Sequence, residues 1–419
     1  MSSTVATATK AEVSVSRYRW VILVACWASF TLTSIDRSTW GPASVFVGES
    51  LHVTVEALGA FATAYYIGYV VTNFWSGFAS DAIGGKVILT VSLLGAGASM
   101  LAFGSTTNAA VGIAVQAVVG FFAGADYAAG IRLIVSWFKP QEQGFAMGIF
   151  TAATSLGTAT ANFVVPALIT ASGWRTSYIM FGAISVVVAV ALFFTLKPGP
   201  LVTEHKHAPK GRFKRDLAAM FTNPNLLFTC LAGFGAFWGL YGFVTWSNTL
   251  MIKGKHISPE TAGLVVGIFA VAAVLAKPII GWICDRFFGG ARKVPSIILL
   301  ALFAAILLVF GRLDGAAAFL WAAPFLGLAA YGWSPLLVSL VPRLVPNGVS
   351  GSASGVANGI WQLGSVIVPV VVGAAFGAAK SFDIAFLALA AGPIFGFIAM
   401  LFVRDRQRPA VAPAAAEKE

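Results

Sequence analysis

Twelve apolar stretches of membrane-spanning length follow one another along the chain, and they constrain its fold more than any other feature. A transmembrane helix needs about 20 predominantly apolar residues. Only 10% of the 419 residues are charged, against about 25% in soluble domains, so the composition excludes a soluble globular protein. The sequence predicts an all-α membrane protein with twelve transmembrane helices, at about 19–47, 55–79, 86–105, 108–137, 144–171, 175–196, 224–251, 260–284, 294–312, 315–342, 349–378 and 382–403.

One polar, proline-containing segment between the sixth and seventh stretches divides the helices into two groups of six. It carries a cluster of basic residues, Lys206, Lys210, Arg212, Lys214 and Arg215. We therefore expect an N-terminal tail (1–17), a six-helix bundle (18–197), a linker (198–223), a second six-helix bundle (224–404) and a C-terminal tail (405–419).

The distribution of Lys and Arg between the loops predicts the orientation of the chain. If the N-terminus is cytoplasmic, nineteen of the 27 basic residues lie in cytoplasmic segments and five lie in loops on the opposite side. Cytoplasmic loops of membrane proteins are enriched in basic residues. Both termini and the linker are therefore expected in the cytoplasm, with the protein in the cell (inner) membrane.

An internal repeat supports the division into halves. The second span ends in Gly77-x-x-x-Asp81-x-x-Gly84-Gly85-Lys86, and the eighth ends, 204 residues later, in Gly281-x-x-x-Asp285-Arg286-x-x-Gly289-Gly290. Two six-helix halves in parallel register are typical of one transporter architecture, which binds its substrate near the midplane between the halves.

These paired loops resemble the signatures of the major facilitator superfamily. Ile35-Asp36-Arg37, Arg132…Ser136-Trp137-Phe138 and Gly355-Val356-Ala357-Asn358 resemble its anion:cation symporter branch, which carries organic and inorganic anions, often with a proton. Lys277-Pro278-x-x-Gly281-x-x-x-Asp285 resembles a motif of monocarboxylate transporters and oxalate–formate exchangers, with Lys in place of Arg.

Five ionisable residues fall inside the apolar stretches: Asp36, Arg37, Asp126, Arg132 and Lys277. A charge at the bilayer centre costs at least roughly 2.5–3.5 kcal/mol, so each of them needs a partner or a water-filled cavity. Each is therefore a candidate for a functional site.

Two of the cations are candidates for substrate binding. Arg37 can hold a carboxylate through two hydrogen bonds, and the resembling branch uses this arginine for its anion. Trp40 follows on the same helix face. Lys277 lies near mid-depth in the other half, so one anion could bind between the two cations. The alternative for each is a structural ion pair.

Two carboxyl groups are candidates for proton coupling. Asp36 is open to two interpretations, a proton carrier or a salt bridge that orients Arg37. Symporters of the resembling branch commonly have a Glu at the position of Ala123 in this chain. Asp126 lies three residues later, nearly one helical turn, so it could supply the missing carboxylate from the same helix face. Its alternative is an ion pair with Arg37 or Lys277.

Further polar residues complete the expected pocket. Tyr69, Thr154, Trp333, Ser334 and Asn358 match positions that contact sugar acids in the resembling branch, and Gln362 lies one turn beyond Asn358. Five residues are expected in gating rather than in the pocket: Asp81, Lys86, Arg132, Asp285 and Arg286.

The sequence contains no catalytic constellation or metal-ligand cluster, so we expect neither an enzyme nor a metal or other cofactor. The leading interpretation is a monomeric secondary transporter that imports a small organic anion with protons, using the proton gradient as its energy source. Its partners would be the anion, the proton and the lipid bilayer, and not nucleic acid. Two alternatives remain open, a carboxylate/carboxylate exchanger and a non-transporting receptor or scaffold with a transporter fold.

Overall fold

The computed structural model describes residues 17–201, 222–345 and 350–404. The predicted tails (1–16 and 405–419) and most of the predicted linker, including its basic cluster, lie outside the described residues. For Phe74, Phe78, Asp81, Pro140, Gln141 and residues 350–352, the backbone alone is described.

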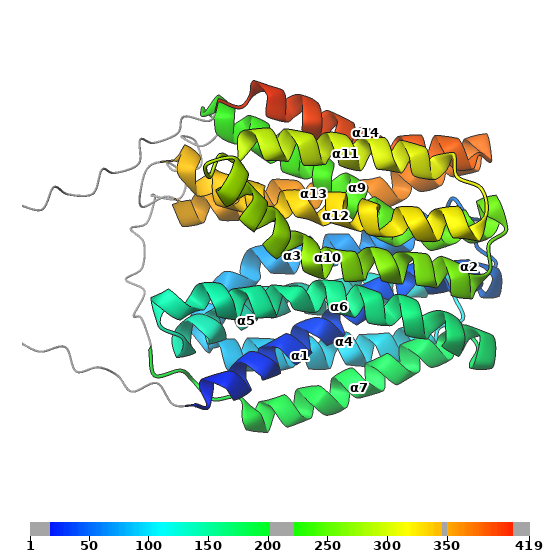
Figure 1. Cartoon of the computed structure of the whole chain (residues 1–419). Coiled ribbons are helices and arrows are strands. Elements are labelled where there is room, and N and C mark those ends of the chain that lie inside the picture. The colour runs from blue at the N-terminus through cyan, green and yellow to red at the C-terminus, as the bar shows by residue number, and fades with distance from the viewer. Residues whose placement is uncertain (1–16, 202–221, 346–349, 405–419) are drawn as a thin grey trace, which may run out of the picture.

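All regular structure in these ranges is helical, as the sequence predicts, and the long helices run side by side (Figure 1). The elements are α1 (Arg19–Ser38), α2 (Trp40–Ser50), α3 (Leu58–Ile83), α4 (Gly85–Gly104), α5 (Ala109–Trp137), α6 (Pro140–Ser172), α7 (Trp174–Thr195), α9 (Pro224–Lys255), α10 (Pro259–Phe287), α11 (Lys293–Gly311), α12 (Ala316–Leu340), the 3₁₀ helix η1 (Val341–Leu344), α13 (Ser350–Ala379) and α14 (Phe382–Phe402).

The first predicted span is divided into two helices at Thr39. Pro42 lacks a backbone N–H group, so the helical hydrogen bond that residue 42 would donate is missing at this point. Counted as one span, α1 and α2 give twelve spans with the other helices of the described ranges. Ten of these, α4–α7 and α9–α14, are long and apolar enough to cross a membrane by a uniform criterion of length and hydropathy.

Polar caps set where several helices begin. The side chain of Asn108 accepts hydrogen bonds from the first turn of α5, and Asn223 does the same for α9. Ser258 and Ser381 cap α10 and α14. Each cap satisfies N–H groups that have no partner within the helix.

Glycines allow the helices of the first bundle (α1–α7) to approach closely. A Cβ atom at Gly120 would collide with the carbonyl oxygen of Tyr65, and one at Gly124 would collide with that of Tyr69. Small residues are favoured where membrane helices pack backbone to backbone. The close contact of α3 with α5 therefore depends on glycine at these positions.

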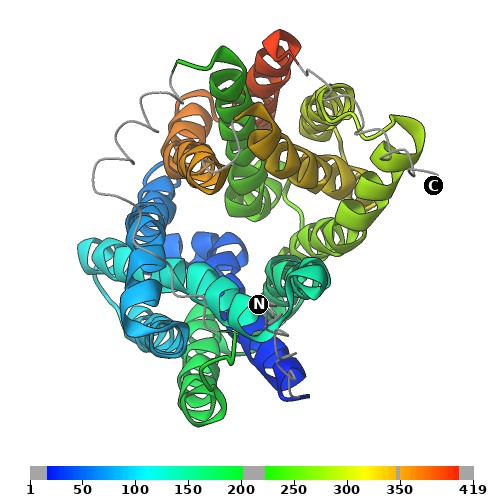
Figure 2. The same ribbon diagram turned by 90° about the vertical axis from the view of Figure 1, so that its left-hand side faces the viewer.

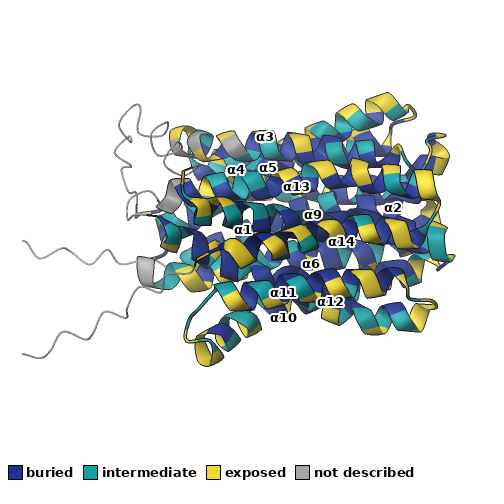
Figure 3. Ribbon diagram, turned by 90° about the horizontal axis from the view of Figure 1, so that it is seen from above, coloured by how far each residue is buried: buried dark blue, intermediate teal, exposed yellow. Residues whose placement is uncertain are grey.

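The first bundle and the second bundle (α9–α14) lie side by side, and Figure 2 shows them end-on. They meet along α6 with α10, α3 with α13 and α2 with α9. Buried residues lie mainly toward the inside of the molecule, and exposed residues are mainly on the outside (Figure 3). We call the end at which the chain enters α1 and leaves α14 the linker face, and the end that carries the α2–α3 and α13–α14 connections the loop face.

Candidate functional site

A cavity of about 450 Å³ lies between the two bundles. Its walls come from α1, α3, α5 and α6 on one side and from α9, α10, α12, η1 and α13 on the other. Cavities of this size typically hold small-molecule ligands. The residues that line it are Phe30, Arg37, Tyr69, Asn73, Tyr127, Ala128, Ile131, Thr151, Thr154, Phe237, Tyr241, Lys277, Ser334, Val338, Val341, Ser354, Gly355, Asn358, Trp361 and Gln362.

The structure brings seven of the nine expected substrate-binding residues to this cavity: Arg37, Tyr69, Thr154, Lys277, Ser334, Asn358 and Gln362. The other two, Trp40 and Trp333, are buried beside it. Trp40 stacks on Phe61 with ring centroids 5.0 Å apart. Trp333 packs behind the wall, 5.5 Å from the ring of Phe237. Their surroundings indicate a role in supporting the walls.

Arg37 and Lys277 face the same cavity from opposite bundles. The guanidinium carbon of Arg37 lies 5.3 Å from the ring centroid of Tyr241, and Nζ of Lys277 lies 5.9 Å from that of Tyr331. Within the described parts of the chain, neither cation forms an ion pair with a carboxylate. The cavity therefore presents two positive charges that pair with no acidic side chain of the residues that the structure describes.

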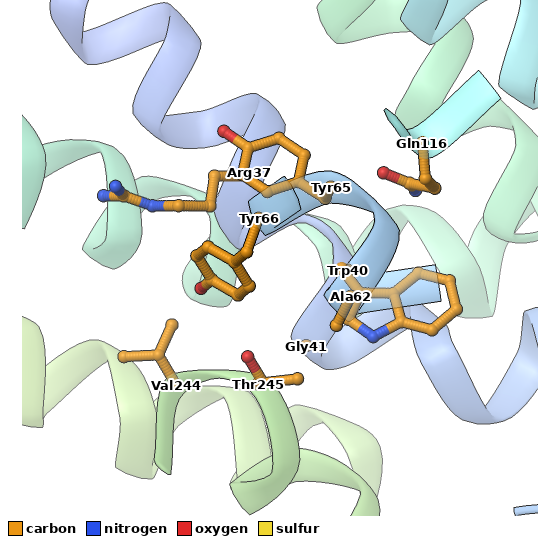
Figure 4. Close-up of a pocket in the computed structure, with 9 residues that line it drawn as sticks. All are labelled: Arg37, Trp40, Gly41, Ala62, Tyr65, Tyr66, Gln116, Val244 and Thr245. Atoms are coloured by element: carbon orange, nitrogen blue, oxygen red, sulfur yellow. The ribbon is translucent and has the colours of Figure 1, made fainter. Parts of the chain in front are cut away.

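A second, much smaller cavity adjoins Arg37 on the side of the loop face. Its volume of about 10 Å³ is close to the space that one water molecule needs. Figure 4 shows the guanidinium group of Arg37 directed away from Trp40 and Gln116, which line the far side of this space. The main cavity thus ends at the layer formed by Arg37 with Tyr65 and Tyr66.

The two carboxyl groups expected in proton coupling lie inside the first bundle and not in the cavity wall. Asp126 accepts hydrogen bonds from Ser29 Oγ at 2.6 Å and from Thr33 Oγ1 at 3.2 Å. Asp36 is 3% exposed, and both of its carboxyl oxygens are buried without a hydrogen-bond partner in the described structure. Residues 29, 33 and 36 share one face of α1, so both carboxyl groups lie at the same helix face.

Contacts between the bundles close the cavity toward the loop face. Two are buried hydrogen bonds, Asn248 to Asn162 at 2.9 Å and Ser44 with Thr249 at 2.6 Å. Two are ion pairs at the surface, Lys253–Glu49 and Lys380–Glu56, each 2.6 Å long. At the other end, the lining residues Ile131, Val341 and Ser354 lie close to the linker-face ends of their helices, so the cavity extends toward that face.

The Glu56–Lys380 pair makes closure of the loop face dependent on pH. Hydrogen bonds from Lys380, from the backbone of Glu56 itself and from Thr54 lower the pKa of Glu56 from 4.5 to about 2, and the hydrogen bond from Lys380 contributes most. A lowered pKa means that the pair stabilises the closed loop face above pH 4.5, and that this contribution is lost as the pH falls toward 2. Because both side chains are partly exposed, we expect Glu56→Gln to increase the fraction of open loop face only about two-fold.

Distances between spin labels placed across the loop face, measured at pH 7 in lipid nanodiscs, test this expectation. The matched control is Asp314→Asn, which removes the 2.6 Å Lys255–Asp314 pair within the second bundle and is expected to leave the distances unchanged. Equal distance distributions in Glu56→Gln and wild type would show that this ion pair does not contribute to closure.

The expected gating residues lie away from the central cavity. Lys86 and Arg132 line a separate cavity at the linker face of the first bundle. Asp285 forms a 2.8 Å ion pair with Arg292, and Arg286 is exposed. The side chain of Asp81 is outside the described part of the structure.

Sequence reasoning missed several aromatic and polar residues of the cavity wall. Phe30 precedes Arg37 by two helical turns, Asn73 follows Tyr69 by one turn, and Phe237 precedes Tyr241 by one turn. Helical spacing from the predicted residues would have found Phe30 and Asn73, because these lie on the same faces.

Residues 26–369 match the family model described as Major Facilitator Superfamily. The chain belongs to this superfamily. It is therefore a multi-pass membrane protein of a transporter family, as its fold and the resemblance of its loops predict.

Several relatives match at low sequence identity over most of the chain. The membrane sensor protein UhpC of Salmonella typhimurium is 24% identical over 330 residues, 74% of this chain and 72% of that protein. The hexuronate transporter of Bacillus subtilis is 24% identical over 283 residues, 65% of this chain and 66% of that protein. The D-galactonate transporter of Escherichia coli O6:H1 is 24% identical over 390 residues, 85% of this chain and 89% of that protein. The prediction that the chain is not an enzyme is confirmed by these relatives.

A solved structure shares the fold. The bacterial homologue of the human lysosomal transporter Spinster, in an inward-facing and unoccupied conformation, superimposes with a TM-score of 0.76 at 15% identity. The match covers 94% of this chain and 100% of that chain. The predicted fold class is therefore confirmed.

Proposed function

We propose that this protein is a secondary transporter that imports a small organic anion by alternating access. The observation that carries the proposal is the pair of cations, Arg37 and Lys277. They face one cavity from opposite bundles, and neither pairs with a carboxylate among the described residues. A buried charge without a counter-charge is costly, and an anion bound between the two would supply that counter-charge. The anion would also join the bundles while they rock about it.

The substrate that we propose is a carboxylate. A guanidinium group fits a carboxylate through two parallel hydrogen bonds, and the polar side chains of Ser334, Asn358 and Gln362 add hydrogen-bonding capacity on the second bundle. Two of the relatives are named for sugar acids, hexuronate and galactonate. The aromatic rings of the cavity, and the resemblance of the Lys277 motif to monocarboxylate transporters, favour a smaller or aromatic carboxylate.

The orientation follows from the basic residues. We propose that the linker face is cytoplasmic, because nineteen basic residues lie on that side and five lie on the other. The structure would then be open to the cytoplasm and closed to the outside, with both termini cytoplasmic and the chain in the inner membrane. We expect it to act as a monomer, because each chain contains both halves of its cavity.

Proton symport is the form of coupling that we favour. Asp36 and Asp126 are buried in the first bundle, and neither forms an ion pair with a basic side chain of the described residues. Burying an ionised carboxyl group without a partner is costly, and a group in this situation is suited to take up and release a proton. The proton gradient would then drive import, and no other cofactor would be needed.

Two further functions have specific support. Neither carboxyl group pairs with Arg37 or Lys277, so a second anion could replace the proton and make the protein an anion exchanger. The relative UhpC is named as a membrane sensor, and a sensor would bind the anion without transporting it.

Uptake by purified protein in liposomes distinguishes these functions. A pH-sensitive dye inside the vesicles reports protons, an inward proton gradient is imposed, and monocarboxylates, dicarboxylates, sugar acids and aromatic acids are screened. Acidification that accompanies uptake of one anion in wild type, and is lost in Lys277→Ala, supports proton symport. Uptake that requires an anion inside and ignores the gradient indicates exchange. Saturable binding without flux indicates a sensor.

A further inference from the structure

A second large cavity, of about 490 Å³, lies at the linker face within the first bundle. It is enclosed by the ends of α3 and α5, the beginning of α4 and the segment 198–201 that follows α7. No described residue of the second bundle lines it, although Ala128 and Ile131 on α5 contribute to this cavity and to the central one. The two cavities therefore have no charged lining residue in common.

The segment after α7 is held firmly as one wall. The backbone N–H of Leu201 donates a 3.0 Å hydrogen bond to the carbonyl oxygen of Ser136 at the end of α5. A Cβ atom at Gly199 would collide with the same carbonyl group, so glycine permits this close approach. The cavity is thus a built feature of the bundle.

Three features of the wall favour an anion. Lys86 and Arg132 both line the cavity, and Lys86 forms no ion pair with any side chain that the structure describes, its Nζ lying over the ring of Phe193 instead. The N-cap of α4 is Gly84, which has no side chain to accept hydrogen bonds from the first turn. Ser80 is 1% exposed, and its hydroxyl has no hydrogen-bond partner in the described structure.

This combination is the one that binds phosphate. The first backbone N–H groups of a helix point outward and carry a partial positive charge, which makes an uncapped helix N-terminus an anion site. The adjacent Lys86 adds a full positive charge, and Arg132 lines the same cavity with a guanidinium group, which is of the kind that binds phosphate through hydrogen bonds. A hydroxyl without a partner supplies a further donor.

The cavity also adjoins an apolar surface. Ile83 and Val87, which line it, are exposed, and Val91 and Leu94 continue the exposed stripe along α4. Side chains at this spacing lie on one face of a helix. A molecule with its phosphate in the cavity could therefore lay an acyl chain along α4.

We propose that this cavity binds the phosphate group of a phospholipid, between Lys86, Arg132 and the N-terminus of α4. The occupant connects the ends of α3, α4 and α5 with the start of the linker. The site is additional to the anion-transport site and does not depend on the proposed transport function. A free phosphate ester would share the same chemistry, so the experiment includes both sources.

Binding to purified protein in detergent tests the proposal by thermophoresis. The probes are dioctanoyl-phosphatidylglycerol, dioctanoylglycerol, which lacks the phosphate, and glycerol 3-phosphate, which lacks the acyl chains. We expect saturable binding of the phosphatidylglycerol and at least about ten-fold weaker binding of each of the others. If glycerol 3-phosphate binds as tightly as the phosphatidylglycerol, the phosphate site stands and the lipid assignment is overturned.

Variants locate the site. Lys86→Gln is expected to weaken phosphatidylglycerol binding about ten-fold, and Lys86→Arg is expected to restore it. Gly77→Leu fills the cavity from a position where a Cβ meets no atom within 4 Å, and it should abolish binding. Lys139→Gln, at an exposed lysine of the same face that does not line the cavity, is the control. Wild-type affinity in both Lys86→Gln and Gly77→Leu, or equal binding of dioctanoylglycerol, overturns the proposal.

Discussion

Replacing Arg37 with alanine is expected to lower the uptake rate at low substrate concentration by at least about 30-fold, the largest effect of any single change in the cavity. Removing one partner of a buried, hydrogen-bonded charge pair costs roughly 2–5 kcal/mol, and 1.4 kcal/mol corresponds to a factor of about ten. Arg37 faces the cavity and has no competing carboxylate in the described structure. The lost contact would therefore be that with the substrate.

The conservative variant separates recognition from charge. Arg37→Lys keeps the positive charge but loses the planar group that holds a carboxylate through two hydrogen bonds, so we expect a loss of about ten-fold, mainly in KM. The control is Arg175→Lys. Arg175 donates hydrogen bonds to Ser50 and to the carbonyl of Thr106 at the loop face, outside the cavity. Radiolabelled uptake in liposomes measures both variants. Wild-type uptake in Arg37→Ala would rule out Arg37 as the substrate ligand.

The fold could be predicted from the sequence because membrane-spanning length is a local property. Each apolar stretch must satisfy its own backbone hydrogen bonds in lipid, so it forms a helix whatever its neighbours do. The break at Thr39 was not predicted, although Pro42 marks it. Proline often remains within membrane helices, as Pro278 does within α10, so a proline alone does not predict a break.

The site could be predicted only in part. The rotation of a helix about its axis, and the helices that it packs against, depend on the whole fold and not on the sequence of that helix alone. Intramembrane charge identified Arg37 and Lys277, and the structure places both at one cavity. The same criterion identified Asp36 and Asp126 but could not show which helix they face. Trp40, three residues after Arg37, packs on Phe61 outside the cavity. Aromatic residues are so frequent in this chain that their type alone could not separate Phe237, which lines the cavity, from the rest of the core.

The packing around the loop face indicates how the cavity could open to the other side. Gly59 approaches the backbone of Pro369 so closely that a Cβ atom would collide with its carbonyl oxygen. Gly41 lies against the carbonyl of Val244 in the same way, with a Cβ 2.8 Å away. These contacts join α3 to α13 and α2 to α9 without large side chains. The buried hydrogen bonds Asn248–Asn162 and Ser44–Thr249 and the ion pairs Lys253–Glu49 and Lys380–Glu56 add to these close backbone contacts, and all of them must separate for the loop face to open.

Replacing Asp126 with asparagine is expected to abolish proton-driven accumulation while leaving anion exchange intact. Asparagine has nearly the same volume, so the packing of α5 against α1 should persist, but it cannot take up a proton. Ser29 and Thr33 donate to Asp126 from α1, the helix that carries Arg37. A change in the protonation of Asp126 therefore changes hydrogen bonds on the helix that holds the proposed anion ligand. We expect the ratio of internal to external substrate under a proton gradient to fall to about one.

Three further variants show which group carries the proton. Asp36→Asn tests whether the unpartnered carboxyl group carries the proton instead, since loss of accumulation in that variant alone would assign the role to Asp36. Ser29→Ala removes a donor but keeps the carboxyl group, so accumulation should persist with a changed dependence on pH. Asp383→Asn, in the exposed first turn of α14, is the control. If all four variants accumulate substrate as wild type does, neither buried carboxyl group is coupled to transport. The two cations of the cavity, which pair with no carboxylate in the described ranges, would then favour an exchanger. An empty cavity with two positive charges resists the return step that symport requires.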